Sequence, residues 1–483
     1  MKKRERVNFQ QLPNLGGGWW ERNPHQPHHI FRPKYPYILN PSPLPIFTLL
    51  QNILIFLILL FFHLHSLTKR KRCFYFSPIS KTPSGPLIFH CACGDFGRIL
   101  MANGNVTSEQ VVLEEDVNSV RLITLNRPRL LNVLSPEVVF LLAKCLEKWE
   151  LEETVELVLI KGAGRAFSAG GDLKVFFAGK HDDSCLEVVY RMYWLLYHFH
   201  TYKKTQVALV HGLVMGGGAS LVVPSKFSVV TEKTVFAVPE ASIGFHTDCS
   251  FSYILSHLPE HLGEYLAVTG ARLDGKEMIA AGLATHFVPS EKLAELEKRL
   301  ISLNSGDENA VRSVIEEFFV AVEPDEKSVL HKQSIINKCF SKNSMEEIID
   351  SFEEEAKTEG NECIKEVLKG LKRSSPTGLK IALRSVREGR KQTLEECMKK
   401  EFRLTMNILR QVISGDVYEG IRALVIDKDN APKWDPPTLN QVRNENLDKV
   451  FQPFQEEMEL QVPSEESRWS GKFENSAYQL IKS

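Results

Sequence analysis

The sequence predicts an α/β fold in which parallel strands alternate with helices, followed by a mainly helical region. Short apolar runs rich in β-branched residues recur between residues 119 and 238, separated by stretches with a helical period. Parallel pairing follows, because strands joined by helices re-enter the sheet in the same direction. After about residue 256 the pattern is mainly helical with polar outer faces, so the C-terminal part is expected to add helices.

The first elements are a strand and a long helix. Residues 119–125 alternate in the manner of a strand, and the stretch 126–128 (NRP) ends it. A helix is expected from Pro136, since Ser135 suits the N-cap and proline suits the first helical position. One apolar face of this helix is expected to be buried, and it comprises Val138, Leu141, Leu142, Cys145, Leu146 and Trp149.

Further strands and helices follow the same two periods. Strands are predicted at 155–161, 206–210, 226–231 and 235–238, and helices at 292–302, 309–321, 345–356 and 376–389. Beyond Trp434 the tail is rich in proline and acidic residues, so residues 436–483 are expected to be loosely held.

The first hundred residues differ in composition from the rest. Residues 1–45 are rich in Pro, His, Asn and Trp without any period, which predicts disorder. Residues 46–67 begin with an almost wholly apolar run that is just long enough to span a membrane, and the basic cluster 69–72 follows it. Two hypotheses stay open: a membrane anchor, or a gene-model extension ahead of a natural start at Met101.

The bulk composition excludes some classes of function. There are 59 basic and 60 acidic residues, and no basic–aromatic cluster in the folded part, so no nucleic-acid partner is expected. Nine cysteines lack regular spacing, and the pair Cys91 and Cys93 lacks the second half of a zinc site. Reduced thiols in an intracellular compartment, and no metal, are therefore expected.

Two glycine-rich turns carry the main chemical signal. They are residues 166–172 (AFSAGGD) and 211–218 (HGLVMGGG), and each follows a predicted strand. Glycine has no Cβ, so bare backbone N–H groups can approach a ligand oxygen. Two N–H groups aimed at one carbonyl oxygen form an oxyanion hole, which predicts acyl chemistry. Either turn alone is better explained by close packing, whereas the two together favour the oxyanion hole.

These turns are part of a resemblance to a known family. The stretch 164–173 (GRAFSAGGDL), the turn 215–218 (MGGG) and the stretch 239–244 (PEASIG) together resemble the crotonase, or enoyl-CoA hydratase/isomerase, superfamily. The stretches 375–380 (SPTGLK) and 419–429 (EGIRALVIDKD) are similar to the C-terminal part of the 3-hydroxyisobutyryl-CoA hydrolase subfamily, and most of all to its plant hydrolase-like members.

The resemblance covers about residues 108–435, and it implies an architecture. The expected fold is a spiral of strand–strand–helix units over residues 101–300, which form an acyl-CoA domain, followed by the subfamily's helical region at 301–435. The implied reaction is hydrolysis of 3-hydroxyisobutyryl-CoA, or of a similar short branched 3-hydroxyacyl-CoA, in valine breakdown. CoA is then part of the substrate, and no cofactor is implied.

The resemblance also assigns roles to residues. The backbone N–H groups of Gly171 and Gly217 would hold the thioester oxygen. Glu240 would be the catalytic carboxylate, as nucleophile or as general base for water. Asp248 would hold the substrate's 3-hydroxyl or orient water. Ser220 stands where hydratases carry a second glutamate, which argues against hydration.

Departures from the subfamily pattern keep alternatives open. Met192 stands where a substrate-contacting glutamate is expected, and Cys249-Ser250-Phe251-Ser252 replaces a stretch rich in glycine or alanine. Phe251 either narrows the acyl pocket or packs into the core. The alternatives are another crotonase reaction, such as hydration or isomerisation, or a catalytically weak protein that binds acyl-CoA. The expected compartment is mitochondrial, with peroxisomal, cytosolic and membrane-anchored locations as alternatives, and the oligomeric state stays open.

Overall fold

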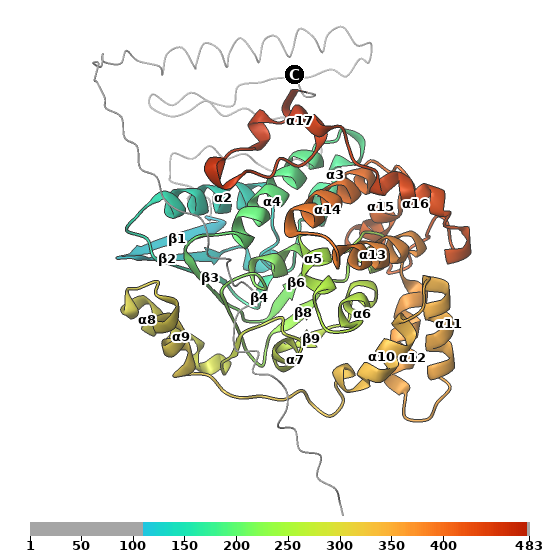
Figure 1. Ribbon diagram of the computed structural model, residues 1–483, viewed down its shortest axis with the longest axis horizontal. Coiled ribbons are helices and arrows are strands. Elements are labelled where there is room, and N and C mark those ends of the chain that lie inside the picture. Colours follow the sequence, from blue (N-terminus) through green and yellow to red (C-terminus); the bar gives the residue numbers. More distant parts are fainter. Residues whose placement is uncertain (1–109, 481–483) are drawn as a thin grey trace, which may run out of the picture. The chain divides into compact units, whose positions relative to one another are not determined.

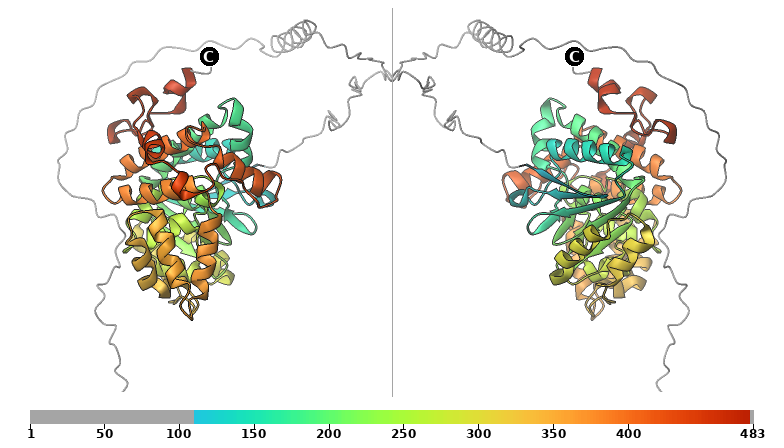
Figure 2. Two further views of the ribbon diagram at one scale, coloured as in Figure 1. Left: turned by 90° about the vertical axis from the view of Figure 1, so that its right-hand side faces the viewer. Right: turned by 90° about the vertical axis from the view of Figure 1, so that its left-hand side faces the viewer.

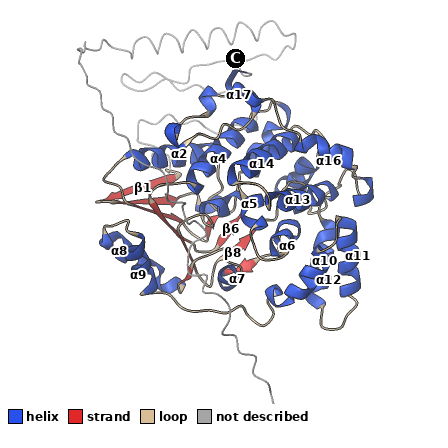
Figure 3. Ribbon diagram, viewed as in Figure 1, coloured by secondary structure: helices blue, strands red, loops and turns tan. Residues whose placement is uncertain are grey.

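Strands of two sheets lie at the centre of the computed structural model, which describes residues 110–480 (Figures 1 and 3). The larger sheet has the strand order β1-β2-β3-β5-β7-β10, and the smaller sheet has the order β4-β6-β8-β9. The bounds are β1 (Val112–Val117), β2 (Val120–Leu125), β3 (Leu157–Gly162), β4 (Ala166–Ser168), β5 (Thr205–Leu209), β6 (Leu213–Met215), β7 (Phe227–Val230), β8 (Val235–Ala237), β9 (Leu273–Asp274) and β10 (His286–Phe287).

Three successive strand pairs each contribute one strand to each sheet. β3, β5 and β7 lie side by side in the larger sheet, and the strands that follow them, β4, β6 and β8, lie in the same order in the smaller sheet. Neighbours within these two sets pair in parallel. A helix or helical turn follows each pair. This repeated strand–strand–helix unit is the spiral that the resemblance implied, so the predicted fold class is confirmed.

The larger sheet is covered on both faces, which explains its continuous apolar strands. Ile123 and Ile160 belong to one hydrophobic cluster, together with residues of α2 (Pro136–Leu151) and α4 (Cys185–His200). Their neighbours Leu122 and Leu159 belong to another, together with residues of α8 (Leu293–Leu303) and α9 (Glu308–Glu316). Figures 1 and 2 show the sheet between these two pairs of helices.

The predicted helices are present, with small differences at their ends. α2 begins at Pro136 behind the Ser135 cap, and five of the six residues expected on its buried face are buried, while Leu141 is half-buried. The other helices are α3 (Leu173–Ala178), α5 (Phe251–Ser256), α6 (Leu262–Thr269), α7 (Gly275–Ala280), α10 (Gln333–Phe340), α11 (Met345–Glu355), α12 (Glu362–Arg373), α13 (Pro376–Gly389), α14 (Leu394–Leu409), α15 (Asp416–Ile421), α16 (Asn444–Phe451) and α17 (Ala477–Leu480).

The helix expected to reach residue 321 ends earlier. α9 stops at Glu316, and the chain then leaves the helical path. The N–H of Val320 donates to the carbonyl of Phe287 at 3.0 Å, so this segment follows β10 instead. A backbone hydrogen bond to the sheet has replaced the one that the next helical turn would have made.

The tail is held more firmly than its composition predicts. We expected residues 436–483 to be loosely held, but Phe473 and Tyr478 are buried and belong to the main hydrophobic cluster. Trp469 stacks on His198 of α4 with ring centroids 4.2 Å apart, and Phe473 packs edge-on against Tyr190 at 5.8 Å. Widely spaced aromatic residues hold this segment. The prediction was based on proline and acidic content alone, and that content gives no information about these aromatic contacts.

Residues 1–109 lie outside the described part of the chain, and with them the expected disordered segment and the apolar stretch 46–67. Within residues 110–480, none of the helices combines the length and the apolar character that a membrane span requires.

Candidate active site

The two glycine turns lie against each other, as the oxyanion hypothesis requires. Gly170 has φ +91°, and a Cβ built on it would lie 3.0 Å from the carbonyl oxygen of Met215 and 3.5 Å from the nitrogen of Gly217. A side chain at this position would therefore push the second turn away. The turns come from different strands, β4 and β6, which pair in parallel in the smaller sheet.

The first turn is fixed by the loop that precedes α2. The side-chain amide of Asn132 donates to the carbonyls of Ala163 and Ala166 at 2.9 and 2.7 Å, and Ser168 Oγ donates to the Asn132 carbonyl at 2.8 Å. The N–H of Leu134 donates to the carbonyl of Gly170, and Gly171 forms an isolated bridge with Leu134. These bonds determine the direction of the backbone at Gly171.

The second turn opens a short 3-10 helix, η3 (Gly216–Leu221). Gly217 is its second residue, and the first N–H groups of a helix have no carbonyl partner within it. Because the helix starts at Gly216, the N–H of Gly217 is one of these groups without a partner in the helix. All six residues of η3 are buried, which keeps this N–H in a site of low polarity.

Glu240 faces the second turn. It is the first residue of the 3-10 helix η4 (Glu240–Ile243) after β8, and it is 8 % exposed. A Cβ built on Gly216 would lie 2.6 Å from Glu240 Oε1, so the carboxylate occupies the space that a side chain at 216 would need. None of the described residues donates a hydrogen bond to its Oε2. Burial and the neighbouring Asp248 carboxylate raise the pKa of Glu240 well above its usual value.

Asp248 lies on the loop between η4 and α5 and is also buried. Its Oδ2 accepts a hydrogen bond from the Cys249 thiol at 3.2 Å and a long one from the Tyr193 hydroxyl at 3.5 Å. Burial raises the pKa of Asp248 to about 7. The structure thus brings Glu240 and Asp248 into electrostatic contact, and neither carboxylate has a cation as a partner among the described residues. Paired carboxyl groups with raised pKa values are typical of acid–base sites.

A chain of neutral polar groups leads from Asp248 into the C-terminal region. The Tyr193 hydroxyl lies 2.9 Å from Thr405 Oγ1, which in turn lies 2.8 Å from His246 Nε2. The Nδ1 of His246 lies 3.0 Å from the carbonyl of Thr247. Burial lowers the pKa of His246 to about 3, which keeps this ring neutral.

With this geometry described, comparison with known proteins identifies the family. A profile of the enoyl-CoA hydratase/isomerase family matches residues 120–451. The chain belongs to this family. The matched part contains both glycine turns, both carboxylates and Thr405.

Similar proteins include two plant hydrolase-like proteins and a bacterial dehydratase. The chain is 66 % identical to 3-hydroxyisobutyryl-CoA hydrolase-like protein 5 of Arabidopsis thaliana, over 78 % of this chain and 99 % of the relative. It is 41 % identical to the mitochondrial hydrolase-like protein 1 of the same plant, over 75 % and 92 %. A carnitinyl-CoA dehydratase from Mycobacterium thermoresistibile has a similar structure, with 32 % identity, a TM-score of 0.67, and coverage of 74 % and 100 %.

Ser220, which stands where hydratases carry a second glutamate, has a structural role in this protein. Its hydroxyl donates to the carbonyl of Cys249 at 2.5 Å and is fully buried. The hydroxyl thus ties η3 to the Asp248 loop. A serine held in this way supplies no carboxylate for handling water.

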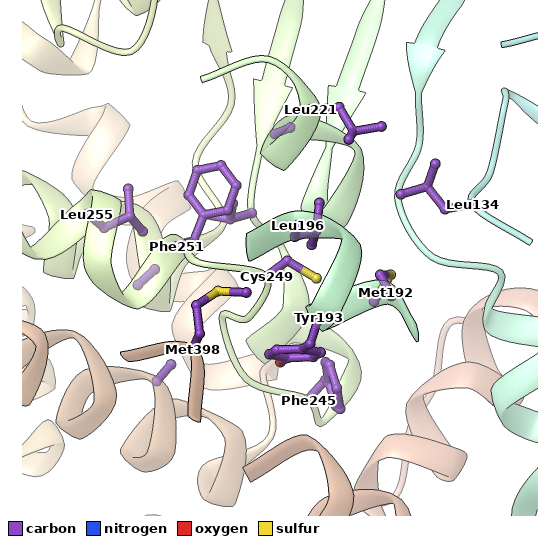
Figure 4. Packing of buried hydrophobic residues seen from close by; sticks show 14 of the residues in the cluster. Leu134, Met192, Tyr193, Leu196, Leu221, Phe245, Cys249, Phe251, Leu255 and Met398 are labelled. Atoms are coloured by element: carbon purple, nitrogen blue, oxygen red, sulfur yellow. The ribbon is translucent and has the colours of Figure 1, made fainter. Parts of the chain in front are cut away.

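Of the side chains that depart from the subfamily pattern, Met192, Cys249 and Phe251 are buried in the main hydrophobic cluster (Figure 4). A Cβ built on Gly217 would lie 3.2 Å from Cys249 Sγ and 3.8 Å from Met192 Sδ, so both sulfur atoms lie close to the second glycine turn. Phe251 is fully buried and packs against Phe236 with ring centroids 5.8 Å apart. Of the two interpretations of Phe251, this contact favours core packing.

Sequence reasoning did not find Tyr193, Glu401 or Thr405. Tyr193 lies in a helix with many aromatic residues, where a buried tyrosine is ordinarily part of the core. Glu401 and Thr405 are both buried on α14, a helix that we did not predict. Their spacing of four residues places them on one face. Buried polar residues on an otherwise apolar helix face were the available signal.

Proposed function

We propose that the protein hydrolyses the thioester of 3-hydroxyisobutyryl-CoA, or of a similar short branched 3-hydroxyacyl-CoA, to the free acid and CoA. The observation that carries this proposal is Glu240, a buried carboxylate beside the second glycine turn whose Oε2 receives no hydrogen bond from the described residues. A buried acceptor without a partner destabilises the folded chain, so its retention indicates a use for it. The printed names of the two plant relatives support the same reaction.

The chemistry follows from where charge develops. The N–H groups of Gly171 and Gly217 donate to the thioester oxygen as attack at the carbonyl carbon makes it negative. In one route Glu240 removes a proton from water, and the water oxygen bonds to the carbonyl carbon. In the other route a Glu240 oxygen forms that bond, and water later cleaves the acyl-enzyme anhydride. In both routes the carbon–sulfur bond breaks, and the CoA thiolate takes up a proton.

Asp248 has two roles consistent with its position. A carboxylate has about four acceptor sites, and the bonds from Cys249 and Tyr193 to Oδ2 use two of them. The others are available for the 3-hydroxyl of the substrate or for the attacking water. Isobutyryl-CoA, a substrate analogue that lacks the 3-hydroxyl, distinguishes binding of the hydroxyl from orientation of the water. If Asp248 binds the hydroxyl, Asp248→Asn slows turnover of the 3-hydroxy substrate much more than turnover of isobutyryl-CoA.

The function is tested by measuring thiol release from 3-hydroxyisobutyryl-CoA, with and without EDTA, because we propose that no metal takes part. We expect release by the wild-type protein in both conditions and loss of release in Glu240→Gln. Glu445→Gln is the matched control, since it makes the same chemical change at an exposed glutamate of α16, and it should keep wild-type release. Binding of the substrate without release would instead support a weak acyl-CoA-binding protein.

A second reaction has one observation in its favour, the similarity to a dehydratase at 32 % identity. Loss of the double bond of an enoyl-CoA without thiol release would support hydration. The position of Ser220 argues against it, because its hydroxyl is bonded to the Cys249 carbonyl and cannot serve as a second acid.

Labelled water separates the two routes for Glu240. In a single turnover in H₂¹⁸O, cleavage of an anhydride at the enzyme's carbonyl leaves ¹⁸O in the Glu240 carboxylate. The peptide that contains Glu240 then gains about two mass units, as covalent catalysis requires. Label only in the released acid fits a general base, and also an anhydride that water cleaves at the substrate's carbonyl, so label in the Glu240 peptide is the result that decides for the covalent route.

We further propose a mitochondrial location and a place in valine breakdown, supported by the printed name of the relative with 41 % identity. Fluorescence of the full-length chain tagged at its C-terminus tests the location. Signal in peroxisomes, in the cytosol or on a membrane supports the corresponding alternative.

A further inference from the structure

The loop that carries Asp248 contains two consecutive residues with a left-handed backbone. The φ angle is +58° at Cys249 and +76° at Ser250. Side chains with a Cβ rarely adopt this region, because the Cβ crowds the backbone carbonyl. Ser250 is also the N-cap residue of α5, and its side chain makes no cap hydrogen bond. Both the backbone conformation and the start of α5 therefore need support from elsewhere.

The hydroxyl of Ser250 lies 2.6 Å from His200 Nε2, and the backbone N–H groups of the bend are supported by one carboxylate on α14. Glu401 Oε2 accepts the N–H of Ser250 at 2.6 Å, and Glu401 Oε1 accepts the N–H of Ser252 at 2.7 Å. Glu401 is fully buried. Burial raises the pKa of Glu401 to about 7, so above that pH its ionised carboxylate offers two equivalent acceptors in a fork. Hydrogen bonds to an ionised acceptor are about twice as strong as neutral ones.

The conformation of this loop determines where the Asp248 carboxylate lies. Cys249 follows Asp248 directly, donates its thiol hydrogen to Asp248 Oδ2, and lies next to Gly217. The carbonyl of Cys249 is held by Ser220 of η3. A change of φ at Cys249 or Ser250 would therefore move Asp248 relative to the second glycine turn.

We propose that Glu401 is a positioning residue of the thioester site: it holds the bend at residues 248–252 so that Asp248 faces Glu240 and the second glycine turn. This inference rests on the proposed function. It also gives the C-terminal helical region a catalytic task, because α14 supports the loop from a segment 151 residues away in the sequence.

Lys400, the neighbouring residue, provides the matched control. It is also buried, and its Nζ donates to the carbonyl of Ser385 and to Gln392 Oε1, both at 2.6 Å. Neither partner belongs to the Asp248 loop. Lys400→Met therefore removes a buried charge and its hydrogen bonds from the same helix turn without touching the bend.

The first test is kinetic and uses the full chain with 3-hydroxyisobutyryl-CoA. Glu401→Gln places an amide NH₂ against one backbone N–H, and we expect kcat to fall about 10- to 100-fold, as small displacements in active sites do. Lys400→Met should keep the wild-type kcat. Because Glu401 acts through Asp248, the double variant with Asp248→Asn should be no slower than Asp248→Asn alone. Losses that multiply, or an equal loss in Lys400→Met, would overturn the proposal.

The second test does not depend on activity. Amide hydrogen exchange of the peptide over residues 247–255 should be faster in Glu401→Gln than in the wild type, while the peptide over 136–151 stays unchanged. If Glu401→Gln does not fold, Glu401→Asp replaces it in this test. Its shorter side chain can reach only one of the two N–H groups, so exchange at 247–255 should again be faster than in the wild type. Unchanged exchange at 247–255 would overturn the proposal. If the wild type released no CoA, the proposed function would fail, and the exchange result alone would decide the role of Glu401.

Discussion

Two buried glutamates in this chain have opposite surroundings. Glu264 on α6 is 1 % exposed, and it receives hydrogen bonds at 3.0 Å from Arg387 Nε and from Arg390 Nη2. Glu240 is 8 % exposed, has no cation beside it among the described residues, and keeps one oxygen without a donor. Two arginines repay the loss of hydration at Glu264, and nothing comparable does so at Glu240.

The difference distinguishes a structural carboxylate from a functional one. Glu264 joins α6 to α13, and Arg387 also donates to the carbonyls of Phe340 and Lys342 near the end of α10. Both oxygens of the Glu264 carboxylate thus accept hydrogen bonds from arginines that hold neighbouring elements together. The Oε2 of Glu240 receives no hydrogen bond from the described residues, and Glu240 lies next to the second of the two glycine turns that can stabilise a negative oxygen. Burial alone would not distinguish the two glutamates, whereas their hydrogen-bond partners do.

Among variants that leave Glu240 in place, the largest expected effect comes from separating the glycine turns. Gly170→Ala places a Cβ 3.0 Å from the carbonyl of Met215 and forces the second turn away from the first. We expect kcat for CoA release to fall about 10²–10³-fold, the usual cost of losing an oxyanion donor.

A control distinguishes this effect from backbone strain. Gly282 also has a positive φ, of +75°, but nothing lies within 4 Å of a Cβ built there. Gly282→Ala should therefore lower stability without lowering kcat. Equal losses of kcat in the two variants would show that the contact between the turns has no catalytic importance.

The next effect concerns stability and should have opposite signs at the two glutamates. Glu264→Gln leaves the guanidinium groups of Arg387 and Arg390 without their carboxylate, so the free energy of unfolding should fall by about 2 kcal/mol. Glu240→Gln replaces a buried carboxylate without a cation by a neutral amide, so the free energy of unfolding should stay equal or rise. Urea unfolding at pH 7.5 measures both. A large destabilisation by Glu240→Gln would contradict this comparison.

The smallest effect is a pH dependence at Asp248. Burial raises its pKa to about 7 in the folded protein, from about 4 in the unfolded chain. Below pH 4 both states hold the proton, whereas between pH 4 and 7 the unfolded chain loses it first and is favoured. The stability that this group contributes is thus present at low pH and is lost as the pH rises through 7.

Asp248→Asn does not titrate, so its stability relative to the wild type should increase between pH 4.5 and pH 8, by about 1–2 kcal/mol once local relaxation is allowed for. Asp350→Asn, at an exposed aspartate of α11, is the control and should follow the wild type. A difference that stays constant across this pH range would mean that Asp248 is not a buried group of raised pKa.

Much of the fold could be predicted because local signals and tertiary packing agree. α13 has the predicted bounds, since the Ser375 cap, Pro376 and the apolar stripe all mark the same helix. The inner strands of the larger sheet, β2, β3, β5 and β7, were found because both of their faces are buried, which leaves continuous apolar runs. The edge strands β1 and β10 were not predicted. The tail was predicted wrongly because its order depends on single aromatic contacts with α4, which no local period reveals.

The candidate site was predictable only in part, for a similar reason. Glycine turns are visible in a sequence because glycine has a special backbone, and the motifs around Glu240 mark its position. The contacts of Asp248 with Tyr193, and of Ser250 with Glu401, join segments 55 and 151 residues apart. Tyrosine and glutamate within helices carry no local signal of such partners. Which polar groups meet in the interior follows from the tertiary fold.

The most direct test of this account measures CoA release from 3-hydroxyisobutyryl-CoA by the wild type, Glu240→Gln and Glu264→Gln, at a temperature where all three are folded. We predict that the wild type and Glu264→Gln release CoA at similar rates and that Glu240→Gln is slower by roughly 10³-fold or more. Release by Glu240→Gln at the rate of the wild type would contradict the account.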